Sequence, residues 1–141
     1  MKLPPFAAQN RFYRGNLHGH STHSDGCLSP QAVVDRYAGL GYDFTCLSDH
    51  LWINDAFAAR TVYDASSLNS TDFITLPSAE LHCFGKRFDQ DGLWHIVANG
   101  LPVDFACPHD TESAPELIAR ARAAGAYVSL AHPEWHAMTT D

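Results

Sequence analysis

Histidine and carboxylate side chains gather in residues 16–26, which read Asn16-Leu-His-Gly-His-Ser-Thr-His-Ser-Asp-Gly26. His18 and His20 are two residues apart at the end of an apolar, strand-like stretch, and residues i and i+2 of a strand share a face. Both imidazoles can therefore turn toward one metal ion, while Gly19 leaves the opposite face unobstructed. The segment predicts a metal site.

Strand-like and helix-like segments alternate along the chain. Strands are expected at residues 14–18, 42–48, 73–76, 81–84, 94–98 and 127–131. One helix begins with Ser29 as its cap and Pro30 at its first position and ends near Gly39 and Gly41, and residues 56–68 form a segment that could be helical. A capping box at Ser113 to Glu116 opens another helix, which ends at Gly125. This alternation predicts an α/β fold with a parallel sheet or barrel.

Residues of metal-ligand type fall mostly where these strands end. His18 and His20 follow the first strand, Asp49 and His50 the second, and Glu80 the third, whereas His95 opens a later strand and His132 ends the last one. The carboxyl ends of parallel strands converge on one rim, where α/β folds place their chemistry. We therefore expect these side chains to meet although they are far apart in sequence.

Composition limits the class of protein. The 141 residues, 45% of them hydrophobic, suffice for one domain with a real core. The formal charge of −7 argues against a basic groove for polymeric nucleic acid. No signal peptide or membrane span is recognised, so we expect a cytoplasmic protein. Cys27, Cys46, Cys83 and Cys107 never form a C-x-x-C pair, and we expect reduced thiols.

Five motifs in order resemble those of the PHP family, the polymerase and histidinol phosphatase domains. They are the His-Gly-His-Ser-Thr-His-Ser-Asp-Gly run, Leu47-Ser-Asp-His50, Ser78-Ala-Glu80, His95-Ile-Val-Ala-Asn-Gly100 and Ala131-His-Pro133. The resemblance covers residues 15–133. The resemblance implies a distorted (β/α)7 TIM-like barrel that holds two or three divalent metal ions and hydrolyses phosphate esters. Residues 1–13 would be an N-terminal extension and residues 14–141 the PHP domain.

The resemblance also implies a ligand set. His18, His20 and Glu80 would hold a first ion, Glu80 would bridge to a second ion bound by His95 and His132, and Asp25 with His50 would hold a third. Imidazole and carboxylate ligands suit zinc, manganese or iron. The nucleophile would be a water activated by the metal, so no side chain is expected to act as a catalytic nucleophile, and the substrate would be a small phosphorylated molecule.

Other residues are given supporting roles or none. Asp49 is expected to orient a ligating imidazole or to cap a loop. Lys86 and Arg87 are candidates to contact a substrate phosphate. His23, His82, His109 and His136 lie outside the matched positions and are expected to be solvated or hydrogen-bonded. The family's late Asp-x-His motif is absent, and a β/α barrel needs upwards of about 200 residues, so we expect an incomplete barrel that lacks its last strands.

Three alternatives stay open at this point. An amidohydrolase-like barrel also begins with His-x-His, but it normally uses a lysine or another carboxylate in mid-barrel, which Glu80 and the Ser-Asp-His run match less well. A non-catalytic metal-binding or regulatory module would keep the ions without turnover. A proofreading exonuclease attached to a DNA polymerase agrees less well with the acidic charge and the short chain. The sequence predicts no oligomeric state.

Overall fold

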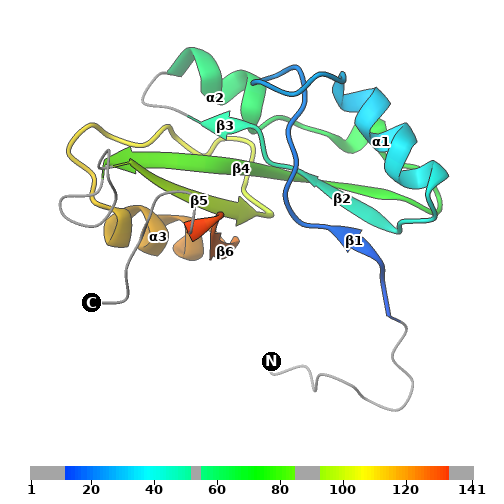
Figure 1. Cartoon of the computed structure of the whole chain (residues 1–141). Helices are drawn as coiled ribbons and strands as arrows, with labels where there is room; N and C mark the ends of the chain where they lie inside the picture. The colour runs from blue at the N-terminus through cyan, green and yellow to red at the C-terminus, as the bar shows by residue number, and fades with distance from the viewer. Residues whose placement is uncertain (1–11, 52–54, 85–92, 134–141) are drawn as a thin grey trace.

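The computed structural model describes residues 12–51, 55–84 and 93–133. Within them the chain forms β1 (Gly15–Asn16), α1 (Pro30–Gly39), β2 (Phe44–Leu47), β3 (His50–Leu51), α2 (Asp55–Thr61), the 3-10 helix η1 (Ser66–Leu68), β4 (Ile74–Phe84), β5 (Leu93–Asn99), α3 (Ala114–Ala123) and β6 (Tyr127–Leu130), as Figure 1 shows. The ambiguous segment at residues 56–68 thus contains most of α2 and all of η1. The two-residue strand β3 was not expected from the sequence.

The two helices that carry capping signals form where the sequence predicts them. The Ser29 hydroxyl accepts a hydrogen bond from the backbone N–H of Ala32 at 3.2 Å, which satisfies one of the free donors at the start of α1. At the start of α3 the backbone N–H of Ser113 donates to the Glu116 carboxylate at 2.8 Å. Gly125 follows α3 with a φ of 99°, a left-handed conformation that favours glycine.

The sheet is mixed, so the expectation of a parallel sheet is only partly right. Its order is β1-β2-β4-β5-β6, with β3 also pairing with β4. The pairs β1–β2, β2–β4 and β3–β4 are parallel, whereas β5 is antiparallel to both β4 and β6. The reason is the connection: only residues 85–92 join β4 to β5, and a parallel pair needs a crossover of a dozen or more residues. The sheet curls into a half-barrel (Figure 1).

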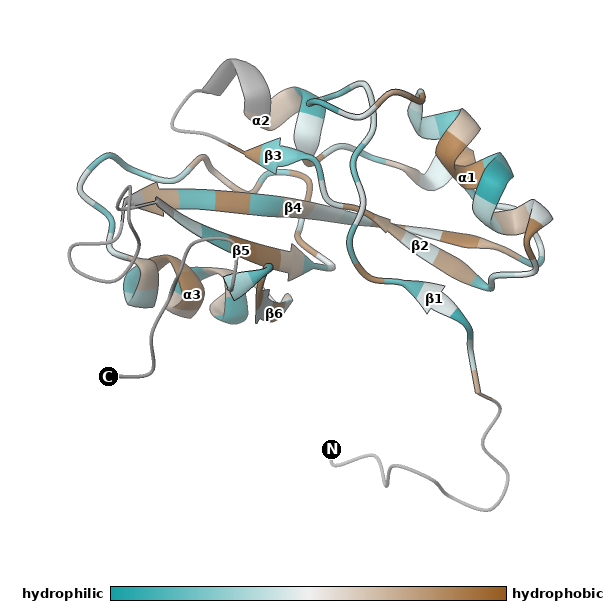
Figure 2. Ribbon diagram, viewed as in Figure 1, coloured by the Kyte–Doolittle hydropathy of each residue, from teal (hydrophilic) through white to brown (hydrophobic). Residues whose placement is uncertain are grey.

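Strand β4 merges two strands that the sequence analysis kept apart, at residues 73–76 and 81–84. Pro77 lies inside it, paired with Leu47 of β2, and a proline within a strand pattern ordinarily argues against a continuous strand. Hydrophilic and hydrophobic residues alternate along β4 (Figure 2). Leu81 lies in the hydrophobic core while Glu80 faces the opposite side, so the strand separates the core from the chemistry.

The helices pack against the sheet and form the hydrophobic core together with it. Helices α1 and α2 lie on one side of β2 and β4, and α3 lies beside β5 and β6 (Figure 1). The main core joins alternate residues of β4 and β5 to the inner face of α3; it includes Leu51, Val62, Leu81, Ile96, Leu101, Phe105, Leu117 and Ala121. Among the four cysteines, Cys27 is exposed and Cys46, Cys83 and Cys107 are buried. In the described ranges, no helix has the length and apolar character needed to cross a membrane.

Candidate metal centre

One buried carboxylate lies at the centre of a group of histidines. Glu80, on β4, is fully buried. Its Oε1 lies 2.7 Å from Nδ1 of His95 and 3.1 Å from Nε2 of His132. Its Oε2 lies 3.0 Å from Nε2 of His20, 3.2 Å from Nδ1 of His50 and 3.8 Å from Nε2 of His18. The structure therefore brings together the imidazoles that the sequence placed at separate strand ends.

The topology explains this convergence. Strand β5 is antiparallel to β4, so its first residues, including His95, lie beside the last residues of β4. Strand β6 is antiparallel to β5 and hence runs with β4, which brings its carboxyl end, followed by His132, to the same edge. His132 has a φ of 29°, the single positive φ among non-glycine residues in the described parts of the chain. Such backbone strain tends to occur at functional sites.

Asp25 adds a second carboxylate at the rim of this group. Its Oδ1 lies 2.6 Å from Nδ1 of His20, and its Oδ2 lies 3.4 Å from Nε2 of His50. The side chain of Asp25 is 68% exposed, in contrast to the buried Glu80. His20 and His50 therefore each lie between two carboxylates, one buried and one open to solvent.

Asp49 holds the loop that carries Asp25. Its buried carboxylate accepts hydrogen bonds from the backbone N–H and the hydroxyl of Ser21, both at 2.7 Å. It also accepts from the hydroxyl of Ser24 at 2.7 Å and from the backbone N–H of Ser24 at 3.1 Å. Of the two roles expected for Asp49, these contacts correspond to the capping of a loop. The carboxylate fixes the turn between His20 and Asp25.

Ser48 orients His18. The Ser48 hydroxyl accepts a hydrogen bond from the backbone N–H of Gly19 at 3.0 Å and donates to the carbonyl of Gly19 at 3.3 Å. Its remaining lone pair is then available to Nδ1–H of His18, 2.8 Å away. This arrangement leaves the lone pair of His18 on Nε2, the nitrogen that faces Glu80.

The charges in the group are strongly coupled. Burial alone would raise the pKa of Glu80, but the surrounding histidines, led by His20 and His95, lower that pKa well below its ordinary value. The contact with Glu80 raises the pKa of His20 to about 9, against the effect of burial. Burial lowers the pKa values of His18 and His50. The environment of Glu80 thus affects the imidazoles differently: the pKa is raised for His20 and lowered for His18 and His50.

These donors suit a divalent metal ion. Three groups of residues each offer ligand atoms that lie within 4.8 Å of one another inside the group. They are His18, His20 and Glu80; His20, Asp25 and His50; and His50, Glu80, His82 and His95. Oε2 of Glu80 is buried and accepts no hydrogen bond within the described ranges, although three imidazole nitrogens lie around it. A cation among these atoms would satisfy the oxygen and the nitrogens together. Imidazole with carboxylate is a ligand set for zinc, manganese or iron.

His82 belongs to this group, although the sequence analysis left it out. It is 1% exposed, and its Nε2 lies 2.5 Å from Nδ1 of His50. Of the two outcomes expected for His82, the contact with His50 corresponds to the hydrogen-bonded one. Its place beside Glu80 was not expected, and it arises because β4 continues without a break from Glu80 and residues i and i+2 share a face. The Glu-x-His spacing is a signal that could have found it.

The other residues considered in the sequence are either outside the described residues or outside the group around Glu80. Lys86, Arg87 and His136 are outside the described residues. The ring of His23 packs against Tyr63 with centroids 4.8 Å apart, and His109 is exposed, so neither joins the group around Glu80.

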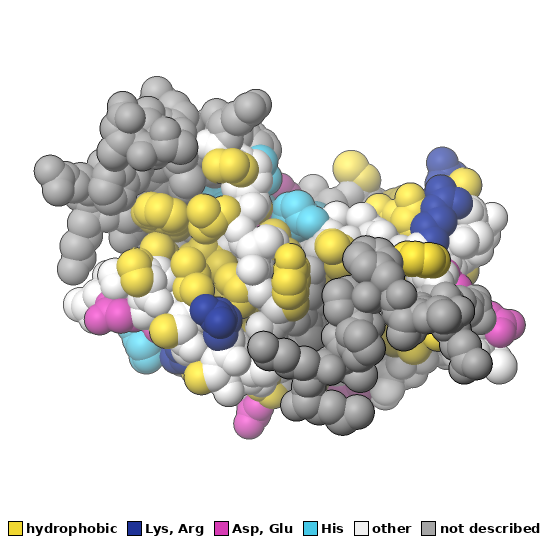
Figure 3. Space-filling model, turned by 90° about the horizontal axis from the view of Figure 1, so that it is seen from below, with side chains coloured by type: hydrophobic (Ala, Val, Ile, Leu, Met, Phe, Trp, Pro, Cys, Tyr) yellow, Lys and Arg dark blue, Asp and Glu magenta, His cyan; other side chains and the backbone are white. Residues whose placement is uncertain are grey.

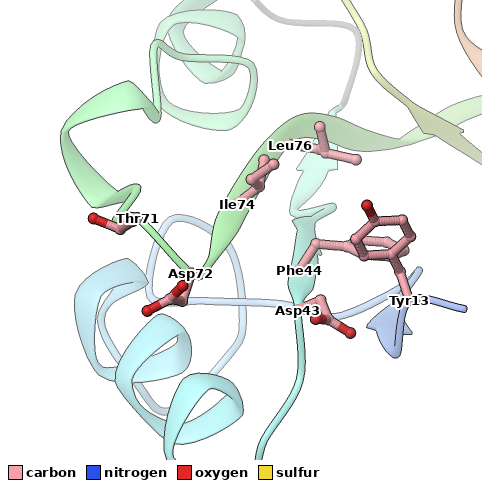
Figure 4. Close-up of a pocket in the computed structure, with 7 residues that line it drawn as sticks. All are labelled: Tyr13, Asp43, Phe44, Thr71, Asp72, Ile74 and Leu76. Atoms are coloured by element: carbon pink, nitrogen blue, oxygen red, sulfur yellow. The ribbon is translucent and has the colours of Figure 1, made fainter. Parts of the chain in front are cut away.

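Two pockets flank the strands. One, of about 480 Å³, lies at the amino ends of β2 and β4 and is lined by Tyr13, Asp43, Phe44, Thr71, Asp72, Ile74 and Leu76, none of them from the histidine group (Figure 4). The other, of about 350 Å³, lies between Gly19, His20 and the α1 residues Arg36 and Tyr37. Seen from below, histidine side chains reach the surface near the middle of the molecule, beside hydrophobic side chains (Figure 3).

Comparisons with known proteins give a relationship of fold. No protein-family model matches the sequence, and no curated protein matches it. Among solved structures, the chain is similar to a two-domain protein from Bacteroides vulgatus ATCC 8482 that contains a predicted PHP-like metal-dependent phosphoesterase. The TM-score is 0.59 at 20% sequence identity, over 92% of this chain and 37% of that one. The chain thus spans little more than a third of that protein and shares its α/β fold.

Proposed function

We propose that this chain is a metal-dependent phosphoesterase of the PHP type. The observation that carries the proposal is the buried Glu80 carboxylate with five imidazoles directed at its two oxygens and Asp25 at the rim. The similar fold of a protein that contains a predicted PHP-like phosphoesterase supports it. On this proposal the half-barrel is part of a distorted (β/α)7 barrel.

The proposed ligands divide between the two oxygens of Glu80. His18 and His20, which face Oε2, would hold one ion with Glu80. His95 and His132, which face Oε1, would hold a second ion bridged by the same carboxylate. Asp25 and His50 would hold a third ion, consistent with the 3.4 Å between Oδ2 and Nε2.

The protein groups around these ligands would fix the geometry of the reaction. When bound, paired divalent ions polarise the phosphoryl oxygens and lower the pKa of water, so that hydrolysis needs no protein nucleophile. Ser48 and Asp49 keep His18 and Asp25 in place, which limits the motion of the site during the reaction. The pocket beside His20 offers room for the organic part of a small ester, with Arg36 as a nearby cation.

Hydrolysis of two substrate classes tests this proposal. Purified protein is loaded with Zn²⁺, Mn²⁺ or Fe²⁺ and assayed with a phosphomonoester and a phosphodiester that release nitrophenol, and with a nitroanilide as the amide control. Release from a phosphate ester that depends on metal, and that is lost in His18→Ala, is the expected result. Cleavage of the amide alone would instead indicate an amidohydrolase. A metal-loaded protein without turnover of any substrate would refute the phosphoesterase and leave a metal-binding module.

A further inference from the structure

The strand geometry of the β4–β5 hairpin places one more histidine on the metal-binding face. His82 follows Glu80 by two residues in β4, so both side chains lie on the same side of the sheet. In the antiparallel register His82 is directly opposite His95, and Glu80 is opposite Val97. Residues directly opposite each other project on the same face, so Glu80, His82 and His95 share it.

The imidazole of His82 lies within the group rather than behind it. Its ring centroid is 4.2 Å from that of His95 and 4.6 Å from that of His50. One ligand atom from each of His50, Glu80, His82 and His95 lies within 4.8 Å of the others. Two metal bonds of about 2.0–2.2 Å span a little over 4 Å, so one ion can reach the atoms of such a group after small side-chain shifts.

The two ring nitrogens of His50 face different parts of the group. Its Nε2 faces Asp25 at 3.4 Å, while its Nδ1 faces Oε2 of Glu80 at 3.2 Å and Nε2 of His82 at 2.5 Å. The two nitrogens lie on different sides of the ring, and ligation through one leaves the other to a hydrogen bond. If His50 ligates the ion beside Asp25, the imidazoles of the four-residue group that are left for an ion on Glu80 are those of His82 and His95.

We propose that His82 is a metal ligand, which joins Glu80 and His95 around the second ion of the centre. The inference rests on the metal centre of the proposed function but does not depend on hydrolysis. Two imidazoles and one carboxylate are the protein ligands of several catalytic zinc and non-haem iron sites.

The additional imidazole bears on the choice of metal. With His132 as well, the ion has four protein ligands, so a position for water requires a coordination number above four. Zinc sites with four protein ligands are closed and tetrahedral, whereas manganese and iron accept five or six ligands. His82 therefore favours Mn²⁺ or Fe²⁺ at this position.

Two substitutions separate ligation from a hydrogen bond to His50. Glutamine at position 82 can place its side-chain amide near the position of Nε2 and keep a hydrogen bond to His50, but it is a poor substitute for imidazole as a transition-metal ligand. Alanine removes both interactions. The parent and three variants are freed of metal and titrated with Mn²⁺ and Co²⁺. The variants are His82→Ala, His82→Gln and, as a control at an exposed histidine, His109→Ala. Bound metal is counted by elemental analysis, and the Co²⁺ absorption spectrum reports the ligand set.

Ligation by His82 predicts that both substitutions at this position release one ion or weaken its binding by more than about 100-fold, since even residues that only orient a ligand are worth 10–100-fold. The Co²⁺ spectrum should change in both variants and stay unchanged in His109→Ala. Parent-like affinity and spectrum in His82→Gln alone would overturn the proposal and make His82 a hydrogen-bond partner of His50. Parent-like binding in both variants would also overturn it.

A crystal structure of the unmutated protein soaked in Mn²⁺ avoids any dependence on how the variants fold. An anomalous peak at bonding distance from Nε2 of His82 is expected, and a peak bonded to Glu80 but not to His82 would overturn the proposal. Parent protein that binds metal without hydrolysing esters refutes the proposed function and leaves this inference standing. Parent protein that binds no divalent ion refutes both.

Discussion

Nε2 of His132 lies 3.1 Å from Oε1 of Glu80, although 52 residues separate them. The contact exists because β5 reverses direction between the two strands that carry these residues, so that β4 and β6 end at the same edge. Glu80 meets His18 and His20 through the other oxygen of its carboxylate. A single buried side chain therefore joins the first and last segments of the described chain.

Glu80→Gln should abolish most metal binding. The substitution keeps the shape of the side chain but removes the charge that faces five imidazoles, and an amide is a weak ligand for a bridging position. Because orienting residues alone are worth 10–100-fold in metal affinity, loss of this ligand should exceed about 100-fold. Elemental analysis after dialysis measures bound metal, with Asp35→Asn, at an exposed residue of α1, as the control. Full metal content in Glu80→Gln would contradict the assignment.

Ser48→Ala should weaken metal binding without removing a ligand. The hydroxyl holds Nδ1 of His18 at 2.8 Å and thereby keeps the Nε2 lone pair directed at Glu80. Loss of such an orienting hydrogen bond costs about 10–100-fold in affinity. Competition with a chelating dye measures the dissociation constant. Ser67→Ala, at an exposed serine, is the matched control, and equal affinities in the two variants would mean that Ser48 does not orient the imidazole.

The sequence predicts the residues of this site better than it predicts the sheet. His18, His20, Asp25, His50, Glu80, His95 and His132 lie where a strand end or a motif placed them, and all seven converge. His95 was expected at the start of a strand, a position that reaches the carboxyl edge only because β5 is antiparallel. Strand direction depends on the pairing partner, which local periodicity does not encode.

The sequence analysis missed the place of His82 in the group around Glu80. It divided β4 between residues 76 and 81, which hid the fact that Glu80 and His82 belong to one strand. Pro77 lies in this interval, and a proline ordinarily argues against a continuous strand. In the structure Pro77 stands at the point where β4 exchanges the partner β2 for β3 and β5. Tertiary pairing overrides the local signal at this point.

Asp49→Ala should destabilise the whole protein as well as the loop. The carboxylate is fully buried and accepts four hydrogen bonds from Ser21 and Ser24, two of them from backbone N–H groups that would lose their acceptor. Hydrogen bonds to a charged group contribute about 1.5–3 kcal/mol each, and they are not additive, so we expect a loss of roughly 3 kcal/mol in the free energy of unfolding. Urea denaturation of metal-free protein measures it. Asp35→Ala should stay within about 0.5 kcal/mol of the parent, and a similarly small change in Asp49→Ala would show that the turn holds without the carboxylate.

Metal-free protein should lose stability between neutral and alkaline pH through His20. Glu80 raises the pKa of His20 from 6.5 to about 9, so the folded state binds this proton more tightly than the unfolded state. The resulting stability is fully present below pH 6.5 and is lost as the pH rises through 9. The difference in free energy of unfolding between the parent and His20→Gln, measured by urea denaturation with a chelator present, should therefore shrink over this interval. In Ser67→Ala, at an exposed serine, the difference from the parent should not change with pH. A bound metal ion takes the place of the proton on His20, so metal binding should release protons and tighten as the pH rises toward 9. A difference between parent and His20→Gln that stays constant from pH 6.5 to 9 would show that Glu80 does not hold His20 in its charged form.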